Sequence, residues 1–257
     1  MIDIVLADDC PFYQEAQKAV KKIQNHPLYH SKTPSLRLEV SRQVTLFIHD
    51  EHQNFKPFRI SLADETLMWR INHFGRNTEP LLKAVLGRLD QPSVFDATAG
   101  LGRESMILAG HGCKVTMFER NPLVWLLLRG AVENLKTSTL PSRFTAGGPV
   151  LAPLGSILDN LDENTFTMDR PIVVYYDPMF PKKQKSAEVK KNMQIFHMIV
   201  GEDDDTLEYA NSLLEIATHH IVIKRPVSAL PLELHVRRSS FVGAKQCRYD
   251  SYYCENR

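Results

Sequence analysis

From about residue 78 onward, short apolar runs alternate with segments of helical periodicity, and this alternation is the strongest constraint on the fold. The apolar runs, typical of buried strands, are residues 94–96, 114–119, 172–177 and 220–224. Helices are expected at residues 78–89, with Thr78 as the N-cap, and at 102–110, 121–135, 186–200 and 204–218. Repeated strand–helix units form parallel sheets covered by helices on both faces. The sequence therefore predicts an α/β fold with a Rossmann-like sheet.

The two ends of the chain follow other patterns. Strand-like runs at residues 4–6, 36–40, 44–48 and 58–60 and a helical segment at 12–24 predict a small α+β region over residues 1–75. This region would be an appendage to a larger domain of residues 76–257. Residues 232–254 contain two strand-like runs, which we expect to pair antiparallel at the sheet edge. We expect residues 137–155 to form a loop around one weak strand.

Composition sets limits on the class of protein. A chain of 257 residues, 43% hydrophobic, can bury a substantial core. Its 31 basic and 30 acidic side chains do not by themselves indicate nucleic acid, although a local basic face would be compatible with them. Four cysteines without CxxC spacing favour reduced thiols and no metal site. No apolar run approaches the roughly 18 residues of a membrane span, so we expect a cytoplasmic protein with no membrane partner.

A strand, a turn of small residues and a helix start follow one another at residues 94–104. Gly100 and Gly102 permit positive φ angles and close approach of a ligand, and the helix start offers unpaired backbone N–H groups. Asp96 precedes them in the pattern acid-x-Thr-x-Gly-x-Gly, which differs from the dinucleotide fingerprint GxGxxG. The pattern is similar to the first motif of class I methyltransferases, with Thr98 in place of its first glycine. It favours a cofactor loop over the alternative, a purely structural turn.

A second acid, Glu119, ends the next predicted strand, seventeen residues after Gly102. A carboxylate at the carboxyl end of a parallel strand can accept both hydroxyls of a ribose. A solvated strand end or a helix cap is the simpler alternative. Arg120 would either stack on an adenine or lie exposed.

The loop Asp177-Pro-Met-Phe-Pro follows the apolar strand 172–177. Its two prolines stiffen it, so that an acid and an aromatic ring, Phe180, are held at the end of a strand. This arrangement suits a flipped base, because the ring stacks on it and the carboxylate accepts hydrogen from its exocyclic amine. The loop resembles the Asp-Pro-Pro-Tyr/Phe signature of amino-methyltransferases, with Met179 at the second proline. The alternative is a rigid turn that packs Phe180 into the core.

Basic residues cluster around this loop. Lysines that could neutralise RNA phosphates follow it, and Lys224 and Arg225 end the next strand at the same predicted edge. A solvated charged face is the alternative. The residues predicted to bind RNA are Lys182, Lys183, Lys185, Lys224 and Arg225.

In order along residues 73–226, these motifs together resemble the ribosomal RNA small subunit methyltransferase J family. The resemblance implies a class I methyltransferase sheet, S-adenosyl-L-methionine as the cofactor, and 16S rRNA or the small ribosomal subunit as the partner. It implies methyl transfer to the exocyclic N2 amine of a guanine. Gly155 and Ser156 are the best counterparts of a further cofactor pair in that family. The full predicted cofactor set is Asp96, Gly100, Gly102, Arg103, Glu104, Glu119, Arg120, Gly155, Ser156 and Asp177.

The predicted catalytic residues are Asp177, between cofactor and target amine, and Phe180, stacked on the guanine. The reaction would be a direct in-line displacement that requires no metal. Three alternatives stay open. The enzyme could be an amino-methyltransferase for tRNA, DNA or a protein glutamine, or the chain could be a non-catalytic RNA-binding module. An NAD-dependent oxidoreductase is disfavoured because GxGxxG is absent.

Overall fold

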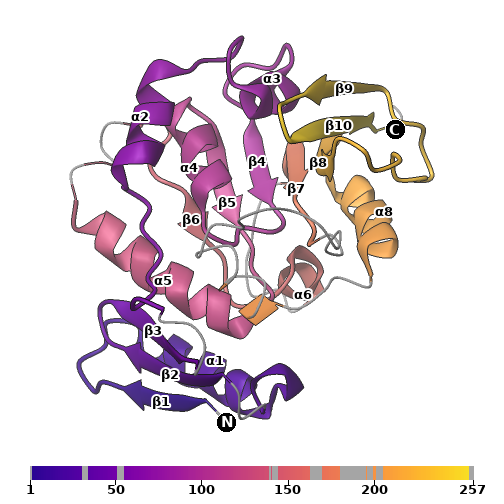
Figure 1. Ribbon diagram of the computed structural model, residues 1–257. Helices are drawn as coiled ribbons and strands as arrows, with labels where there is room; N and C mark the ends of the chain where they lie inside the picture. The colour runs from indigo at the N-terminus through magenta and orange to yellow at the C-terminus, as the bar shows by residue number, and fades with distance from the viewer. Residues whose placement is uncertain are drawn as a thin grey trace.

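The computed structural model describes residues 2–30, 34–50, 55–138, 140, 144–162, 170–179, 195, 199–200 and 205–254. Seven strands form the main sheet: β4 (Ser93–Asp96), β5 (Lys114–Met117), β6 (Val150–Leu151), β7 (Val173–Tyr176), β8 (His220–Pro226), β9 (Ser240–Gly243) and β10 (Cys247–Tyr253). Their order is β6-β5-β4-β7-β8-β10-β9. The first five are parallel, and β10 is antiparallel to both of its neighbours. The predicted α/β class and the antiparallel pair at the sheet edge are confirmed (Figure 1).

Helices cover both faces of this sheet. They are α2 (Glu65–His73), α3 (Pro80–Leu86), α4 (Arg103–Gly110), α5 (Pro122–Lys136), α6 (Ile157–Asp162) and α8 (Thr206–Ile216). Successive side chains of a strand point to opposite faces, and β7 shows this clearly. Val173 and Tyr175 join the apolar cluster that includes α2, α3, α4 and α5, whereas Val174 and Tyr176 join the cluster that includes α8.

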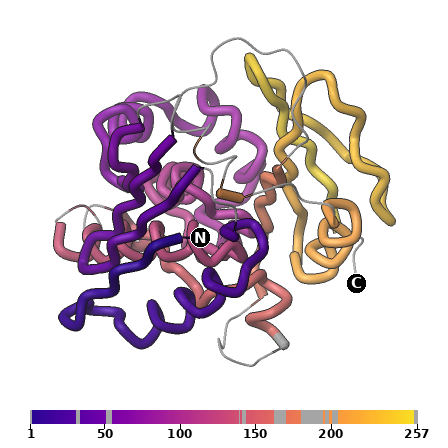
Figure 2. The backbone as a smooth tube through the Cα atoms, turned by 60° about the horizontal axis from the view of Figure 1, so that its bottom comes forward, coloured from indigo at the N-terminus to yellow at the C-terminus, as the bar shows by residue number. Residues whose placement is uncertain are grey.

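The N-terminal region has its own sheet of β1 (Asp3–Leu6), β2 (Ser35–Val40) and β3 (Val44–His49), with α1 (Tyr13–Asn25) and the 3₁₀ helix η1 (Pro27–Tyr29). The predicted α+β appendage is therefore present, and it packs through α1 and β3 against α5 (Figure 1). Gly130 of α5 makes this contact close, because an added Cβ would lie 2.9 Å from the backbone nitrogen of Val44. Figure 2 shows this region and the β9–β10 pair on opposite sides of the molecule.

Several element bounds differ from the predictions. Helix α3 is shorter than the expected 78–89, and Thr78 is not its N-cap: Glu79 accepts the hydrogen bond from the Leu81 nitrogen, while the Thr78 hydroxyl accepts from Gly75 in the preceding turn. Helix α2 was not predicted. It packs on α4 of the larger region, although its residues precede the expected domain boundary at residue 75. That boundary stays a prediction.

Other differences are smaller. The strand expected at residues 58–60 is reduced to one bridge between Phe58 and Leu46. Most of the helix expected at residues 186–200 lies outside the described residues. Within the part of the chain that the structure describes, no helix is long and apolar enough to cross a membrane.

Candidate functional site

Three acidic residues lie at the carboxyl ends of three neighbouring strands. Asp96 ends β4, Glu119 follows β5, and Asp177 follows β7. Strand β4 is also where the strand order reverses, since the chain proceeds from β4 to β5 on one side and later to β7 on the other. Ligands of doubly wound sheets bind in the crevice at such a switch point. The predicted cofactor and base motifs therefore meet at one edge of the sheet.

The turn after β4 has a backbone that lets a ligand approach closely. Gly100 and Gly102 have φ angles of +52° and +70°, the left-handed region that favours glycine. The Gly100 nitrogen donates to Oε2 of Glu119 at 3.0 Å, which joins the two predicted parts of the cofactor site. At Gly102 an added Cβ would lie 2.5 Å from a methyl carbon of Leu62, so a larger residue would require that side chain to move.

Asp96 is buried beneath this turn, with 1% of its surface exposed. Its carboxylate accepts from the Ser105 hydroxyl at 2.6 Å and from the Thr98 nitrogen at 3.2 Å. Burial raises the pKa of Asp96 to about 7, although both hydrogen bonds act in the opposite direction. These contacts indicate that Asp96 positions the turn, and a direct contact with the cofactor stays a prediction.

Glu119 is held from both sides. Its Oε1 accepts from the Asn121 nitrogen at 2.8 Å, and its backbone carbonyl accepts from the Gly155 nitrogen at 3.1 Å. Asn121 in turn caps α5, accepting from the nitrogens of Leu123 and Val124 at 3.0 Å, as its position before Pro122 predicted. The carboxylate is fixed at the end of β5, where a ribose would be recognised.

The structure brings Gly155 and Ser156 beside Glu119, at the exit of β6. Asp159 accepts from the backbone nitrogen of Ser156 at 2.7 Å, and the Ser156 hydroxyl accepts from the Asp159 nitrogen at 3.1 Å, which makes a capping box at the start of α6. The pair lies between β6 and the short helix α6, and the side chain of Ser156 is engaged in the cap, while its contact with a cofactor stays a prediction.

Arg120 and Arg103 both form ion pairs. Arg120 donates to both carboxylate oxygens of Asp205, at 2.6 and 2.9 Å, and lies 5.9 Å from the ring centre of Tyr209. The guanidinium of Arg120 lowers the pKa of Asp205. Arg103 contacts Asp64, the N-cap of α2, at 2.5 Å. Both arginines border the cofactor edge, and their contacts with a cofactor stay predictions.

Asp177 is tied to the glycine turn and to β8. Its backbone nitrogen donates to the Thr98 hydroxyl at 2.7 Å, so the residue that replaces the first motif glycine links the two loops. Its Oδ2 accepts from the Lys224 ammonium at 2.7 Å, and that ammonium also reaches Oε1 of Glu104 at 3.4 Å. The side chain of Asp177 is 30% exposed, whereas Asp96 is sealed.

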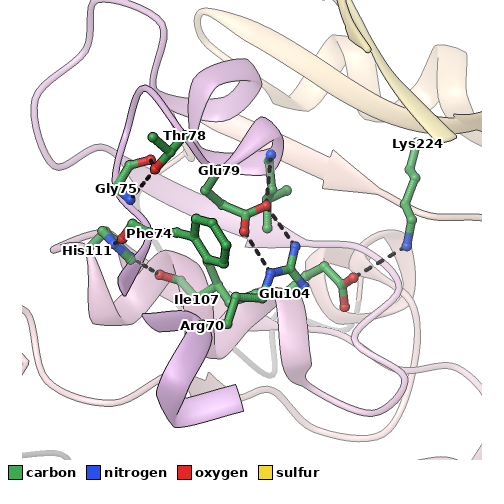
Figure 3. Close-up of polar contacts among 10 residues, drawn as sticks. Arg70, Phe74, Gly75, Thr78, Glu79, Glu104, Ile107, His111 and Lys224 are labelled. Atoms are coloured by element: carbon green, nitrogen blue, oxygen red, sulfur yellow. Dashed lines mark hydrogen bonds and ion pairs between the residues drawn. The ribbon is translucent and has the colours of Figure 1, made fainter. Parts of the chain in front are cut away.

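Lys224 was predicted to bind RNA phosphate, but its ammonium lies between the carboxylates of Asp177 and Glu104. Figure 3 shows its contact with Glu104. Burial would lower the pKa of Lys224, and the charges of Asp177 and Glu104 outweigh this and raise it. Burial likewise would raise the pKa of Glu104, and Lys224 and Arg70 together lower it. Arg70 is itself held by Glu79 through two contacts of 2.7 Å. Lys224 therefore stays protonated next to Asp177.

This role of Lys224 could have been found from the sequence, because β8 follows β7 in the sheet and its end must lie beside Asp177. Arg225, also predicted to contact RNA, donates to the carbonyl of Leu230 at 2.7 Å, and its RNA contact stays a prediction. The remaining predicted residues, Phe180, Lys182, Lys183 and Lys185, lie outside the described residues.

Comparisons with known proteins identify the family of this chain. A family model for SAM-dependent methyltransferases matches residues 21–254. The chain is similar to proteins named ribosomal RNA small subunit methyltransferase J from Alteromonas mediterranea (34% identity, 88% of this chain and 86% of the relative), Haemophilus ducreyi (37%, 88% and 88%) and Hahella chejuensis (40%, 76% and 72%). The chain therefore belongs to the SAM-dependent methyltransferases and, within them, to the ribosomal RNA small subunit methyltransferase J family. A SAM-dependent methyltransferase structure from Neisseria gonorrhoeae, 24% identical, superposes with a TM-score of 0.67 over 99% of this chain and 97% of its own, and shows the same fold.

Membership in this methyltransferase family makes S-adenosyl-L-methionine the cofactor, and the residues present fit it. The buried carboxylate of Glu119 suits the ribose hydroxyls, and the positive-φ turn at Gly100 allows the backbone to approach the ligand. Asp177 borders the same turn through Thr98 and places an acceptor beside it. The site therefore combines residues suited to bind the cofactor with a carboxylate that can accept a hydrogen bond from an amine.

Proposed function

We propose that this protein transfers a methyl group from S-adenosyl-L-methionine to the exocyclic N2 amine of a guanine in 16S ribosomal RNA. The relatives named ribosomal RNA small subunit methyltransferase J support the substrate class. The observation that carries the chemistry is Asp177, fixed by Thr98 and Lys224 at the end of β7 beside the glycine turn. A ribosomal substrate would place the reaction in the cytoplasm.

The residues of this chain would act mainly by alignment. The lone pair of an aryl amine is delocalised, so catalysis depends on holding the nitrogen in line with the methyl group. The cofactor supplies that methyl as a sulfonium, which becomes a neutral thioether. Asp177 would accept a hydrogen bond from the amine and then take the proton that the nitrogen loses as the N–C bond forms. Phe180 would stack on the guanine and fix its plane.

The test is a methyl-transfer assay with labelled S-adenosyl-L-methionine. The acceptors are unmethylated small ribosomal subunits, protein-free 16S rRNA, tRNA, DNA and glutamine-containing protein. We expect N2-methylguanosine in 16S rRNA or the subunit only. Label in another acceptor would instead establish a different amino-methyltransferase.

Calorimetric titration tests cofactor binding independently of the identity of the substrate. S-adenosyl-L-methionine should bind, NADH should not, and Glu119→Ala should weaken binding by about tenfold or more, because the ribose loses its acceptor. A protein that binds the cofactor and methylates none of the acceptors would contradict the proposed substrate. Absence of cofactor binding would favour a non-catalytic RNA-binding module.

A further inference from the structure

A groove of about 1010 Å³ lies away from the three acids, between α1, α5 and residues 148–154. Its floor is apolar and includes Val132 and Leu135 of α5 and Leu151 and Leu154 of the facing segment. Val150 at its rim is 53% exposed, a high value for an apolar strand residue. The groove thus offers an accessible apolar surface that nothing in the proposed chemistry uses.

The edge of this groove is basic. Lys18, Lys21 and Lys22 lie at spacings i, i+3 and i+4 on one exposed face of α1, while its opposite face is buried in the core. Lys136 of α5 also lines the groove. Within the described residues, none of the three α1 lysines forms an ion pair. Like charges at these spacings destabilise a helix, so stability alone does not account for them.

Acidic residues do not cancel this charge. The one acid among the described lining residues, Glu15, is paired with Arg129 at 2.7 Å. Glu133, which lies 3.7 Å from Lys136, is also held by Arg129 at 3.0 Å. A chain with almost equal numbers of basic and acidic residues therefore concentrates positive charge along one groove.

Both walls of the groove lead to the cofactor edge. After α1, the hydroxyl of Tyr29 donates to the Asn121 side chain at 3.0 Å, next to Glu119. The other wall continues from β6 to Gly155, which contacts Glu119. Since β6 is three strands from β7 in the sheet, these two strands lie about 14 Å apart, a span of a few nucleotides.

We propose that this groove binds the single-stranded RNA that flanks the target base. Its phosphates contact Lys18, Lys21, Lys22 and Lys136, and its bases lie on the apolar floor. Proteins that bind single strands combine a basic groove that follows the backbone with a surface on which the bases lie, most often aromatic; in this groove that surface is aliphatic. The proposal rests on the proposed function, because it assigns the route by which ribosomal RNA reaches Asp177.

The test uses charge reversal in the full-length protein. The groove variant is Lys18→Glu, Lys21→Glu and Lys22→Glu. The matched control is Lys83→Glu, Arg88→Glu and Lys114→Glu, three exposed basic residues next to the opposite ends of β4 and β5. Affinity for unmethylated small subunits, protein-free 16S rRNA and a short single-stranded RNA is measured by filter binding at several salt concentrations.

We expect the groove variant to bind RNA at least about tenfold more weakly and to show a shallower dependence of log affinity on log salt, by about 0.7 for each lost phosphate contact. The control should bind as the wild type does. Cofactor affinity should be unchanged in both variants, and the single-turnover rate at saturating RNA should be unchanged in the control. Wild-type RNA affinity and salt dependence in the groove variant would overturn the proposal while leaving the proposed function intact. An equal loss in the control would overturn it too, because only net charge would then matter. A wild-type enzyme that methylates no ribosomal RNA would refute the proposed function instead.

Discussion

An aspartate lies at the carboxyl end of each of the strands β4 and β7, and the two side chains have opposite surroundings. Asp96 is sealed under the glycine turn and receives its hydrogen bonds from neutral donors, Thr98 and Ser105. Asp177 is partly exposed and receives its hydrogen bond from the ammonium of Lys224. The strands are adjacent and parallel, so position in the sheet does not explain the difference.

The environment therefore separates two roles for one residue type. Burial without a cation favours the protonated form of a carboxyl group and suits it to hold backbone in place. A partly solvated carboxylate beside a cation stays an acceptor and can meet a substrate. We infer that Asp96 holds the backbone of the cofactor turn in place and that Asp177 accepts the hydrogen bond from the substrate amine.

The largest effect should come from Asp177→Ala. Removing the acceptor that aligns the amine should lower kcat by about 100- to 1000-fold, measured as single-turnover methyl transfer at saturating cofactor and RNA. The urea unfolding midpoint should change little, because the side chain is partly exposed. Asp177→Asn keeps one acceptor oxygen and should retain more activity than the alanine variant. A near-wild-type rate in Asp177→Ala would remove Asp177 from the chemistry.

Lys224→Met should have a smaller effect with a distinctive pH signature. Without the ammonium, Glu104 loses a charge that lowers its pKa, so this pKa rises. Because the Lys224 ammonium joins Glu104 to Asp177, protonation of this pair of carboxylates then sets in at higher pH, and the acid limb of the kcat profile should move upward. The loss in kcat at neutral pH should be about tenfold, because Asp177 loses the charged donor that holds its side chain at 2.7 Å. Lys224→Arg, which keeps the charge, should restore the limb. An unchanged profile in Lys224→Met would show that Lys224 does not position Asp177.

The sequence predicted the parts of this site that depend on backbone geometry. Gly100, Gly102 and the Asn121 cap follow from local patterns, and the structure has them at the predicted strand ends. Ion-pair partners that come from distant segments were not predicted. Lys224 lies 47 residues from Asp177 along the chain, and the contact exists only because β8 pairs with β7. The N-terminal groove likewise needs α1 to pack on α5, which no local pattern encodes.

The smallest effect, and the sharpest test of the comparison, is on stability in Asp96→Asn. The pKa of Asp96 in the folded protein, about 7, exceeds the ordinary value of 3.8, so the folded state holds its proton more tightly than the unfolded state. The stability that this proton contributes is complete below pH 3.8 and is lost as the pH rises toward 7.

Asparagine cannot ionise, and the Ser105 hydroxyl can turn to meet its amide. From pH 5 to pH 8 the wild type should therefore lose about 2 kcal/mol in free energy of unfolding relative to the variant. Urea titrations at the two pH values measure this difference. Parallel pH dependence in both proteins would mean that Asp96 titrates as an ordinary carboxylate, and the contrast with Asp177 would then have to rest on geometry alone.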